Sequence, residues 1–434
     1  MGCQYFEPCE HGAGSFTVAM PKLTFGRGCL SEVGARAEMR GFKRAAIFTD
    51  PFLVGSSYLK TVTESLSSHS IDFDIFSEIR IEPDDKTIVN AARFLDEGNF
   101  DGVISVGGGS SIDTAKGALV YHAYPADFTD YFAPPVGAGL PIPGPVLPHI
   151  ACPTTSGTGS ECTSVSVIRL TEHNCKFVIG SPHLVPVDAI VDPACTDTLH
   201  ANVIASTGFD LLCHAIECYT AKSYTKWDAI ADPARRPLLQ GANPWSDLAA
   251  REALNIAGCY LERGVKDNQD TKARDQLMWG ATLAGMAFGN SGTHLPHAMS
   301  YGVTHLMNNI ETAGYKVSSP FIPHGISVVV SAPAIFEFLA EGAPERHLEA
   351  AEYLGMDIKD ADLQDAGEVV SKRIIQLMRG TGMPNGLGEI GFGGQDVNAM
   401  AESAIRQGRA IQNAPRVAER PDLKSIYSSA LSYW

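Results

Sequence analysis

The stretch Gly102-Val-Ile-Ser-Val-Gly-Gly-Gly-Ser-Ser-Ile-Asp113 reads as a buried strand that turns through consecutive glycines into a helix. The glycines let backbone amides approach a ligand closely, and the N-terminus of the following helix favours phosphate. The spacing is not G-x-G-x-x-G, so the ordinary dinucleotide fingerprint is missing. An equally good interpretation is a tight turn in which Ser110 or Ser111 caps the helix and Asp113 lies in its first turn.

Outward from this stretch, short apolar runs alternate with helical patterns as far as Asp192-Pro193. This alternation predicts βαβ units and a mainly parallel sheet. Beyond it, helical periodicity dominates to the C-terminus. We therefore expect an α/β domain over residues 1–193 and an all-helical domain over residues 194–434. Residues 221–245 interrupt the helices with several prolines and glycines, which is typical of a lid or a substrate wall.

Composition sets limits on the partners. A chain of 434 residues with a formal charge of −16 is poorly suited to nucleic acid or to an anionic membrane surface. Its apolar runs stay short of the ~18 residues that a membrane-spanning helix needs. The first residues carry neither a secretory signal nor an Arg-rich transit pattern, and the cysteines are scattered without paired spacing. These features predict a cytoplasmic protein that acts on small molecules.

A second loop, Thr154-Thr-Ser-Gly-Thr-Gly-Ser-Glu161, follows another predicted strand. Its hydroxyl groups and glycines suit ribose, phosphate or carboxamide groups. A capped helix start, with Thr158 and Glu161 forming a capping box, explains the same residues.

Asp50 ends the second predicted strand, where a carboxylate can accept hydrogen bonds from the adenosine ribose. A carboxylate at that place disfavours a 2′-phosphate and therefore favours NAD over NADP. An ordinary loop aspartate before Pro51 is an equally good interpretation.

Asp210 and His214 stand four residues apart in a stretch of good helix formers, which places them on one helix face. Alone, such a pair is more often a carboxylate and a core histidine than a metal site. His294-Leu-Pro-His297 and Pro323-His324-Gly325 supply further imidazoles. One carboxylate oxygen with the nitrogens of His214, His297 and His324 suits Fe(II) or Zn(II), with a position left for a substrate oxygen.

Taken in order, Gly-Gly-Gly-Ser-x-x-Asp, Thr-Thr-Ser-Gly-Thr-Gly-Ser-Glu, Asp-x3-His and Pro-His-Gly resemble the iron-containing (group III) alcohol dehydrogenases over residues 20–430. The resemblance implies an N-terminal dinucleotide-binding α/β domain and a helical metal domain, a dehydroquinate synthase-like fold. It also implies a homo-oligomer, NAD as cofactor and Fe(II), or else Zn(II), as metal. The residues that fall on the family's metal ligands are Asp210, His214, His297 and His324. Those that fall on its cofactor positions are Asp50, Gly108, Gly109, Ser110, Asp113, Thr154, Thr155 and Thr158.

Four further stretches are similar to one branch of the family: residues 236–247, 289–294, 297–301 and 344–348. That branch oxidises 4-hydroxybutyrate to succinate semialdehyde and passes the hydride to 2-oxoglutarate, giving 2-hydroxyglutarate, while the nicotinamide stays bound. In this reading the metal polarises the alcohol oxygen, and the two glycine- and threonine-rich loops hold the nicotinamide that takes the hydride.

The departures from the family leave the proton relay open. Tyr301 stands where many relatives carry a further histidine, so it is a candidate for the proton donor. Arg235, Arg236 or Lys316 could bind a substrate carboxylate, or could be solvated surface charges. The alternative functions are an ordinary NAD-dependent alcohol dehydrogenase for small primary alcohols, a dehydroquinate synthase-like lyase and a non-catalytic dinucleotide-binding protein.

Overall fold

The computed structural model describes residues 5–6, 12–134, 136–233, 236–306, 310, 314–315 and 321–434. The chain forms two compact units. One comprises residues 19–198, and the other comprises residues 1–18 together with residues 199–434.

The first unit is built on a parallel sheet of strand order β1-β8-β5-β4-β2-β3. Its strands are β1 (Lys22–Phe25), β2 (Arg44–Thr49), β3 (Asp72–Phe76), β4 (Gly102–Gly107), β5 (His149–Pro153) and β8 (Asp188–Val191). Its helices are α1 (Val33–Met39), α2 (Ser57–Ser68), α3 (Asp85–Gly98) and α4 (Gly109–Ala123). An antiparallel hairpin, β6 (Val165–Leu170) and β7 (Cys175–Gly180), lies outside the main sheet.

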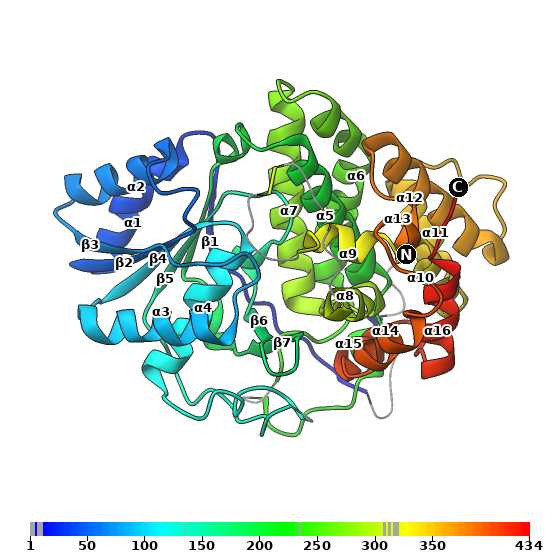
Figure 1. The fold of residues 1–434 in the computed structure, drawn as a ribbon, viewed down its shortest axis with the longest axis horizontal. Coiled ribbons are helices and arrows are strands. Elements are labelled where there is room, and N and C mark those ends of the chain that lie inside the picture. Colours follow the sequence, from blue (N-terminus) through cyan, green and yellow to red (C-terminus); the bar gives the residue numbers. More distant parts are fainter. Residues whose placement is uncertain are drawn as a thin grey trace. The chain divides into compact units, whose positions relative to one another are not determined.

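Helices cover both faces of this sheet (Figure 1). On one face, apolar side chains of α1 and α2 such as Val33 and Val62 pack on Ile47 and Ile104. On the other face, side chains of α3 and α4 pack on Phe48 and Val103. Because parallel strands point the same way, the loops that follow β2, β4 and β5 meet at one edge of the sheet. That edge carries most of the predicted cofactor residues.

The second unit is helical in its described residues. Its helices are α5 (Ala201–Thr220), α6 (Pro244–Lys266), α7 (Thr271–Ser291), α8 (Leu295–Leu306), α9 (His324–Val329), α10 (Ala332–Leu339), α11 (Pro344–Tyr353), α12 (Ala366–Thr381), α13 (Gly386–Glu389), α14 (Val397–Ala404), α15 (Gly408–Asn413) and α16 (Arg420–Ser429). Short 3-10 turns join elements of both units: η2 (Cys29–Glu32), η3 (Ser160–Cys162), η4 (Pro182–Leu184), η5 (Pro193–Thr196), η6 (Tyr224–Lys226), η8 (Ala340–Gly342) and η9 (Leu363–Asp365).

The expected class, a parallel α/β unit followed by a helical one, is therefore confirmed. The compact units differ in their limits from the expected division between residues 193 and 194. They divide between Thr198 and Leu199, and residues 1–18 join the helical unit. Hydrogen bonds explain the second difference, because Tyr5 Oη donates to Asp247 Oδ2 over 2.9 Å and Ala13 N donates to the Trp227 carbonyl over 2.9 Å.

Candidate metal centre and cofactor loops

One face of α5 supplies the acidic part of the candidate metal centre. Asp210, His214 and Glu217 follow one another at intervals of four and three residues, so their side chains leave the helix on the same side. All three are buried. Gly208 lets α6 pack closely against this helix, since a Cβ there would lie 2.3 Å from Leu261 Cδ1. Packing against neighbouring helices therefore fixes the direction of this face.

The Pro323-His324-Gly325 motif places a histidine beside α5. Pro323 caps α9, and His324 is its first residue. A Cβ on Gly325 would lie only 1.7 Å from the Ser206 carbonyl oxygen of α5, so only glycine allows α9 to come this close. The glycine thus sets the distance between the two helices, and with it the position of His324.

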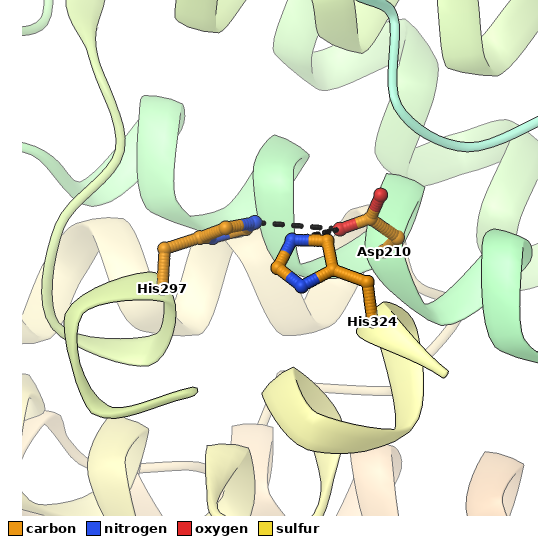
Figure 2. Close-up of side chains that lie close together, drawn as sticks. All are labelled: Asp210, His297 and His324. Carbon is orange, nitrogen blue, oxygen red and sulfur yellow. Dashed lines mark hydrogen bonds and ion pairs between the residues drawn. The ribbon is translucent and has the colours of Figure 1, made fainter. Parts of the chain in front are cut away.

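Asp210, His297 and His324 converge, and their ligand atoms all lie within 4.8 Å of one another (Figure 2). Asp210 Oδ1 is 3.3 Å from His297 Nε2 and 3.7 Å from His324 Nε2. Two ligand atoms of a tetrahedral ion, each about 2.0–2.1 Å from the metal, stand roughly 3.3 Å apart. The spacing and the mixed oxygen and nitrogen donors therefore fit a divalent metal ion of the iron or zinc type.

His214 lies beside these three residues without joining the converging group. Its Nδ1 is 3.7 Å from Asp210 Oδ1. Its ring stacks between Phe288 and His297, with ring centroids 4.2 Å and 4.3 Å away. The structure therefore brings all four predicted ligands to one place, whereas the role of each as a ligand stays a prediction.

Glu217 orients His297, and sequence reasoning had not singled it out. Its Oε2 accepts a short hydrogen bond from His297 Nδ1. Its Oε1 accepts from the backbone N–H of His294 over 3.0 Å and of His297 over 3.1 Å. Because Glu217 holds a proton on Nδ1, Nε2 is the ring nitrogen that would bind a metal ion in place of its own proton, as in carboxylate–histidine–metal arrangements. The available signal was its position seven residues after Asp210, on the same helix face.

The charges at this centre favour a cation. Burial by itself would raise the pKa of Asp210. The positive charges of the nearby His214 and His324 have the larger combined effect, and the pKa of this carboxyl is lowered. Burial likewise opposes protonation of His297, yet the Glu217 and Asp210 carboxylates raise the pKa of its imidazole to about 10. The two buried carboxylates thus stabilise positive charge at this centre, and a bound metal ion would supply such a charge.

His294 has a structural role. Its Nδ1 accepts from the Leu295 N–H over 2.8 Å, and its Nε2 is 3.0 Å from Thr220 Oγ1. Burial lowers the pKa of this imidazole to about 4, so the ring is neutral near pH 7.

Tyr301 follows His297 by one turn of α8 and is buried. Its ring centroid lies 6.5 Å from that of His324. This position is near the candidate metal centre, and its part in proton transfer stays a prediction.

The two glycine-containing loops lie together at the edge of the sheet in the first unit. Their strands, β4 and β5, are neighbours, and Thr154 N donates to the Gly107 carbonyl over 3.0 Å. A Cβ on Gly109 would lie 2.7 Å from Thr158 Cγ2, and one on Gly108 would lie 3.3 Å from Thr155 Cγ2. The glycines therefore allow the two loops to pack against each other at the start of α4.

The expected capping roles around α4 were wrong. Gly108, not Ser110 or Ser111, is the N-cap residue of α4, and Ser110 Oγ accepts from the Glu82 N–H over 3.1 Å. Asp113 is likewise engaged within the fold. Its Oδ1 accepts from Ser160 Oγ over 2.5 Å, and its Oδ2 accepts from the Val167 N–H over 3.0 Å. Asp113 thus braces the second loop, and direct contact of Ser110 or Asp113 with a cofactor stays a prediction.

The expected helix start at Thr158 was also wrong. The chain makes only the short turn η3, with Gly159 in the left-handed region at a φ of 57°. Thr158 Oγ1 accepts from the Ser160 N–H over 3.3 Å, two residues on. The N-cap residue of this turn is Gly159, which has no side chain to make the first bond of a capping box.

Lys116 is the centre of this arrangement, and sequence reasoning missed it. The side chain is fully buried in α4. Its Nζ lies 2.6 Å from the Ser160 carbonyl, 2.8 Å from the Thr163 carbonyl and 3.1 Å from the Val165 carbonyl, with the hydroxyls of Ser160 and Thr163 at 3.3 and 3.0 Å. Burial lowers its pKa to about 8, while the Asp113 carboxylate opposes that shift. The amine is therefore charged at neutral pH and ties the second loop to α4.

Asp50 directly follows β2, as expected. Its Oδ1 accepts from the N–H groups of Phe52 over 2.9 Å and Leu53 over 3.2 Å. Burial raises the pKa of this carboxyl. The carboxylate thus shapes its own turn, and its proposed contact with a ribose stays a prediction.

Comparison with known proteins assigns the family. A model described as "Iron-containing alcohol dehydrogenase" matches residues 21–193, and one described as "Fe-containing alcohol dehydrogenase family, C-terminal" matches residues 238–431. The chain belongs to the iron-containing alcohol dehydrogenase family. It is therefore an oxidoreductase that acts on CH–OH groups, and the resemblance expected from the motifs is confirmed.

Relatives and solved structures agree with this assignment. Mitochondrial hydroxyacid-oxoacid transhydrogenases from Xenopus tropicalis and Homo sapiens are each 36% identical over 97% of this chain, covering 91% and 90% of their own length. A 1,3-propanediol oxidoreductase structure is 28% identical with a TM-score of 0.84, covering 96% of this chain and 100% of its own. A sulfoacetaldehyde reductase from Bifidobacterium kashiwanohense in complex with NAD+ is 25% identical with a TM-score of 0.78, covering 96% and 99%.

These relatives correct the predicted location. A cytoplasmic protein was expected, but the transhydrogenases that match 97% of this chain are named as mitochondrial, which contradicts that expectation. The expectation had rested on the scattered cysteines and on first residues without a secretory or Arg-rich transit pattern. Neither feature outweighs the names of these relatives. Among the helices of the described residues, we find none whose length and apolar character would let it span a bilayer.

Proposed function

We propose that this chain is a hydroxyacid-oxoacid transhydrogenase, which moves a hydride from 4-hydroxybutyrate to 2-oxoglutarate through bound NAD. The observation that carries the proposal is the similarity to transhydrogenases along nearly the whole chain, 36% over 97% of its length. The convergence of Asp210, His297 and His324 supports it, because hydride transfer from an alcohol needs a group that polarises the oxygen.

Asp210, His214, His297 and His324 would hold the divalent metal, with Fe(II) as the family's expected ion and Zn(II) as the alternative. When bound, such an ion supplies Lewis-acid polarisation of a hydroxyl or carbonyl oxygen. Glu217 keeps the His297 ring in the orientation that offers Nε2. Tyr301 is the buried hydroxyl proposed to exchange the proton. Metal analysis of the purified protein tests the choice of ion.

The loops after β4 and β5 are proposed to hold the dinucleotide. Gly108 and Gly109 present backbone N–H groups at the start of α4, where phosphate is favoured. Thr154, Thr155 and Thr158 offer hydroxyls from the neighbouring loop, and Asp50 selects NAD through the ribose. Calorimetric titration with NAD and with NADP tests this assignment, which requires that NAD bind more tightly.

Turnover of 4-hydroxybutyrate with 2-oxoglutarate, with iron supplied and no free NAD, tests the reaction. Chromatography should show succinate semialdehyde and 2-hydroxyglutarate forming in equal amounts. A control with NAD and the alcohol alone addresses the second candidate, an ordinary NAD-dependent alcohol dehydrogenase, which the fold similarity to 1,3-propanediol oxidoreductase favours. NADH formation from simple alcohols, without paired products in the first assay, would contradict the transhydrogenase.

The family assignment speaks against the lyase and against a non-catalytic protein. We also propose a homo-oligomer, which light scattering tests directly.

A further inference from the structure

The helical unit contains a pocket, and none of the described residues that line it is a predicted metal ligand. In the connection between α5 and α6, the residues that line this pocket are Tyr224, residues 227–230, Arg236, Pro237 and Gln240. Residues 13–15 and Arg409 of α15 complete its lining, and its volume is about 250 Å³. Most substrate and drug pockets measure about 300–1,000 Å³, so this one suits a small molecule and excludes a dinucleotide.

Directed hydrogen bonds build this pocket. The amide of Gln240 is bonded in both directions to Thr17, accepting from its N–H over 2.9 Å and donating to its carbonyl over 2.7 Å. Gly12 pairs with Asp228 in an isolated β-bridge, next to the bond from Ala13 N to the Trp227 carbonyl. Such backbone pairing fixes the wall, because each bond aligns one segment against the other.

Two guanidinium groups face this space. Arg236 donates from Nη1 to Thr17 Oγ1 and from Nη2 to Ser15 Oγ, each over 2.9 Å. Arg409 lies over the Trp227 ring, 4.8 Å from its centroid, and its Nη2 donates to the Leu239 carbonyl. Within the described part of the chain, neither arginine forms an ion pair with a carboxylate. Because guanidinium offers five N–H donors, both retain donors for a ligand.

The electrostatic setting favours an anion. Lys222 Nζ lies 4.3 Å from the centroid of the same Trp227 ring, so two cations share one indole. Among the described residues that line the pocket, Asp228 is the one carboxylate. The chain as a whole has a net charge of −16, so the charge of this pocket is opposite in sign to that of the whole protein. A planar carboxylate matches the guanidinium fork in geometry and in charge.

The rest of the lining suits a short carbon chain. Trp227, Ile230 and Pro237 give an apolar wall beside the two arginines. Methylene groups gain from such a wall, whereas an inorganic ion would leave it uncovered.

We propose that this pocket binds a short-chain mono- or dicarboxylate, with its carboxylate against Arg236 and Arg409. The proposal concerns binding and goes beyond the transhydrogenase reaction, so it stands or falls separately. Arg235 and Lys316, also considered as carboxylate ligands, lie outside the described residues.

The test is calorimetric titration of the metal-loaded, NAD-saturated protein with glutarate, which cannot serve as a substrate alcohol or oxoacid. The unmodified protein should bind glutarate. Arg236→Met and Arg409→Met should each weaken binding about ten-fold or more, because each removes a charge-assisted pair worth about 1.5–3 kcal/mol. Glutaramide, which has the same shape without charge, should bind far more weakly.

The matched control is Arg406→Met, which removes an arginine near the same helix that does not line the pocket. It should leave glutarate binding unchanged. Equal weakening by Arg406→Met would show a general charge effect and overturn the proposal. No binding to the unmodified protein, or phosphate binding more tightly than glutarate, would overturn it too. Circular dichroism of each variant checks folding, and Arg409→Lys, which keeps the charge, should recover part of the affinity.

Discussion

Lys116→Met offers the sharpest test of how the cofactor loops are held. Methionine fills a similar volume but has no donor, so the carbonyls of Ser160, Thr163 and Val165 lose the ammonium they share. Asp113 also loses the cation that most opposes the effect of burial on the pKa of its carboxyl. Removing one partner of a buried charged network costs roughly 3–5 kcal/mol, because the remaining groups stay desolvated and unpaired. That is a large part of a total stability of about 5–15 kcal/mol.

Two measurements check this prediction. Urea denaturation followed by circular dichroism should show a free energy of unfolding lower by roughly 3–5 kcal/mol for the variant. Hydrogen exchange with mass spectrometry should show faster exchange in peptides that contain Ser160–Val167, and unchanged exchange in α7 of the other unit. All tryptophans lie in the helical unit, at positions 227, 245, 279 and 434, so their fluorescence reports whether that unit stays folded.

Lys86→Met is the control, since Lys86 lies in α3 of the same unit and is not buried. It should change stability by less than about 0.5 kcal/mol. If Lys116→Met matched Lys86→Met in stability and left exchange at Ser160–Val167 unchanged, the buried ammonium would not organise the loop, and the reasoning would be refuted.

Glu217→Gln should weaken metal binding about 10–100-fold, because the carboxylate that orients His297 is lost. Competition with a chelator measures the affinity for the metal, and an unchanged affinity would contradict the role assigned to Glu217. Gly325→Ala should lower the free energy of unfolding by about 1–3 kcal/mol and reduce the metal content, because its methyl group would lie 1.7 Å from the Ser206 carbonyl oxygen. Unchanged metal content together with unchanged stability would argue against the packing of α9 on α5. Burial lowers the pKa of His149 to about 3 and that of His347 to about 4, so both stay neutral in the fold while the unfolded chain binds protons below about pH 6.5. Stability should therefore fall with pH below that value, by up to about 1.4 kcal/mol per pH unit for each histidine, and urea titrations of His347→Gln should show a shallower slope than the unmodified protein.

The sequence alone predicted most elements that local periodicity encodes. The strand that begins at Gly102 and the helix around Asp210 were expected and observed. The hairpin of β6 and β7 and the helix α16 were not expected. A short hairpin outside the main sheet and a short polar helix carry weak periodic signals, which explains both omissions.

The sequence by itself determined which chemistry was available. The order of the glycine loop, the hydroxyl loop, Asp-x3-His and Pro-His-Gly indicated the family, because each motif specifies a backbone conformation or a ligand type locally. The i, i+4 spacing was also enough to place Asp210 and His214 on one helix face, and both residues lie in α5. Such inferences hold because helix geometry is the same in every protein.

Tertiary packing decided the rest. Glu217 is the partner of His297 because α8 packs beside α5. Asp113 and Lys116 hold the second loop because η3 lies against α4. The carboxylate pocket joins residues 13–15 to Arg236 and Arg409, segments that no local pattern relates. Periodicity encodes which face a side chain takes, whereas which faces meet depends on packing between elements far apart in the chain.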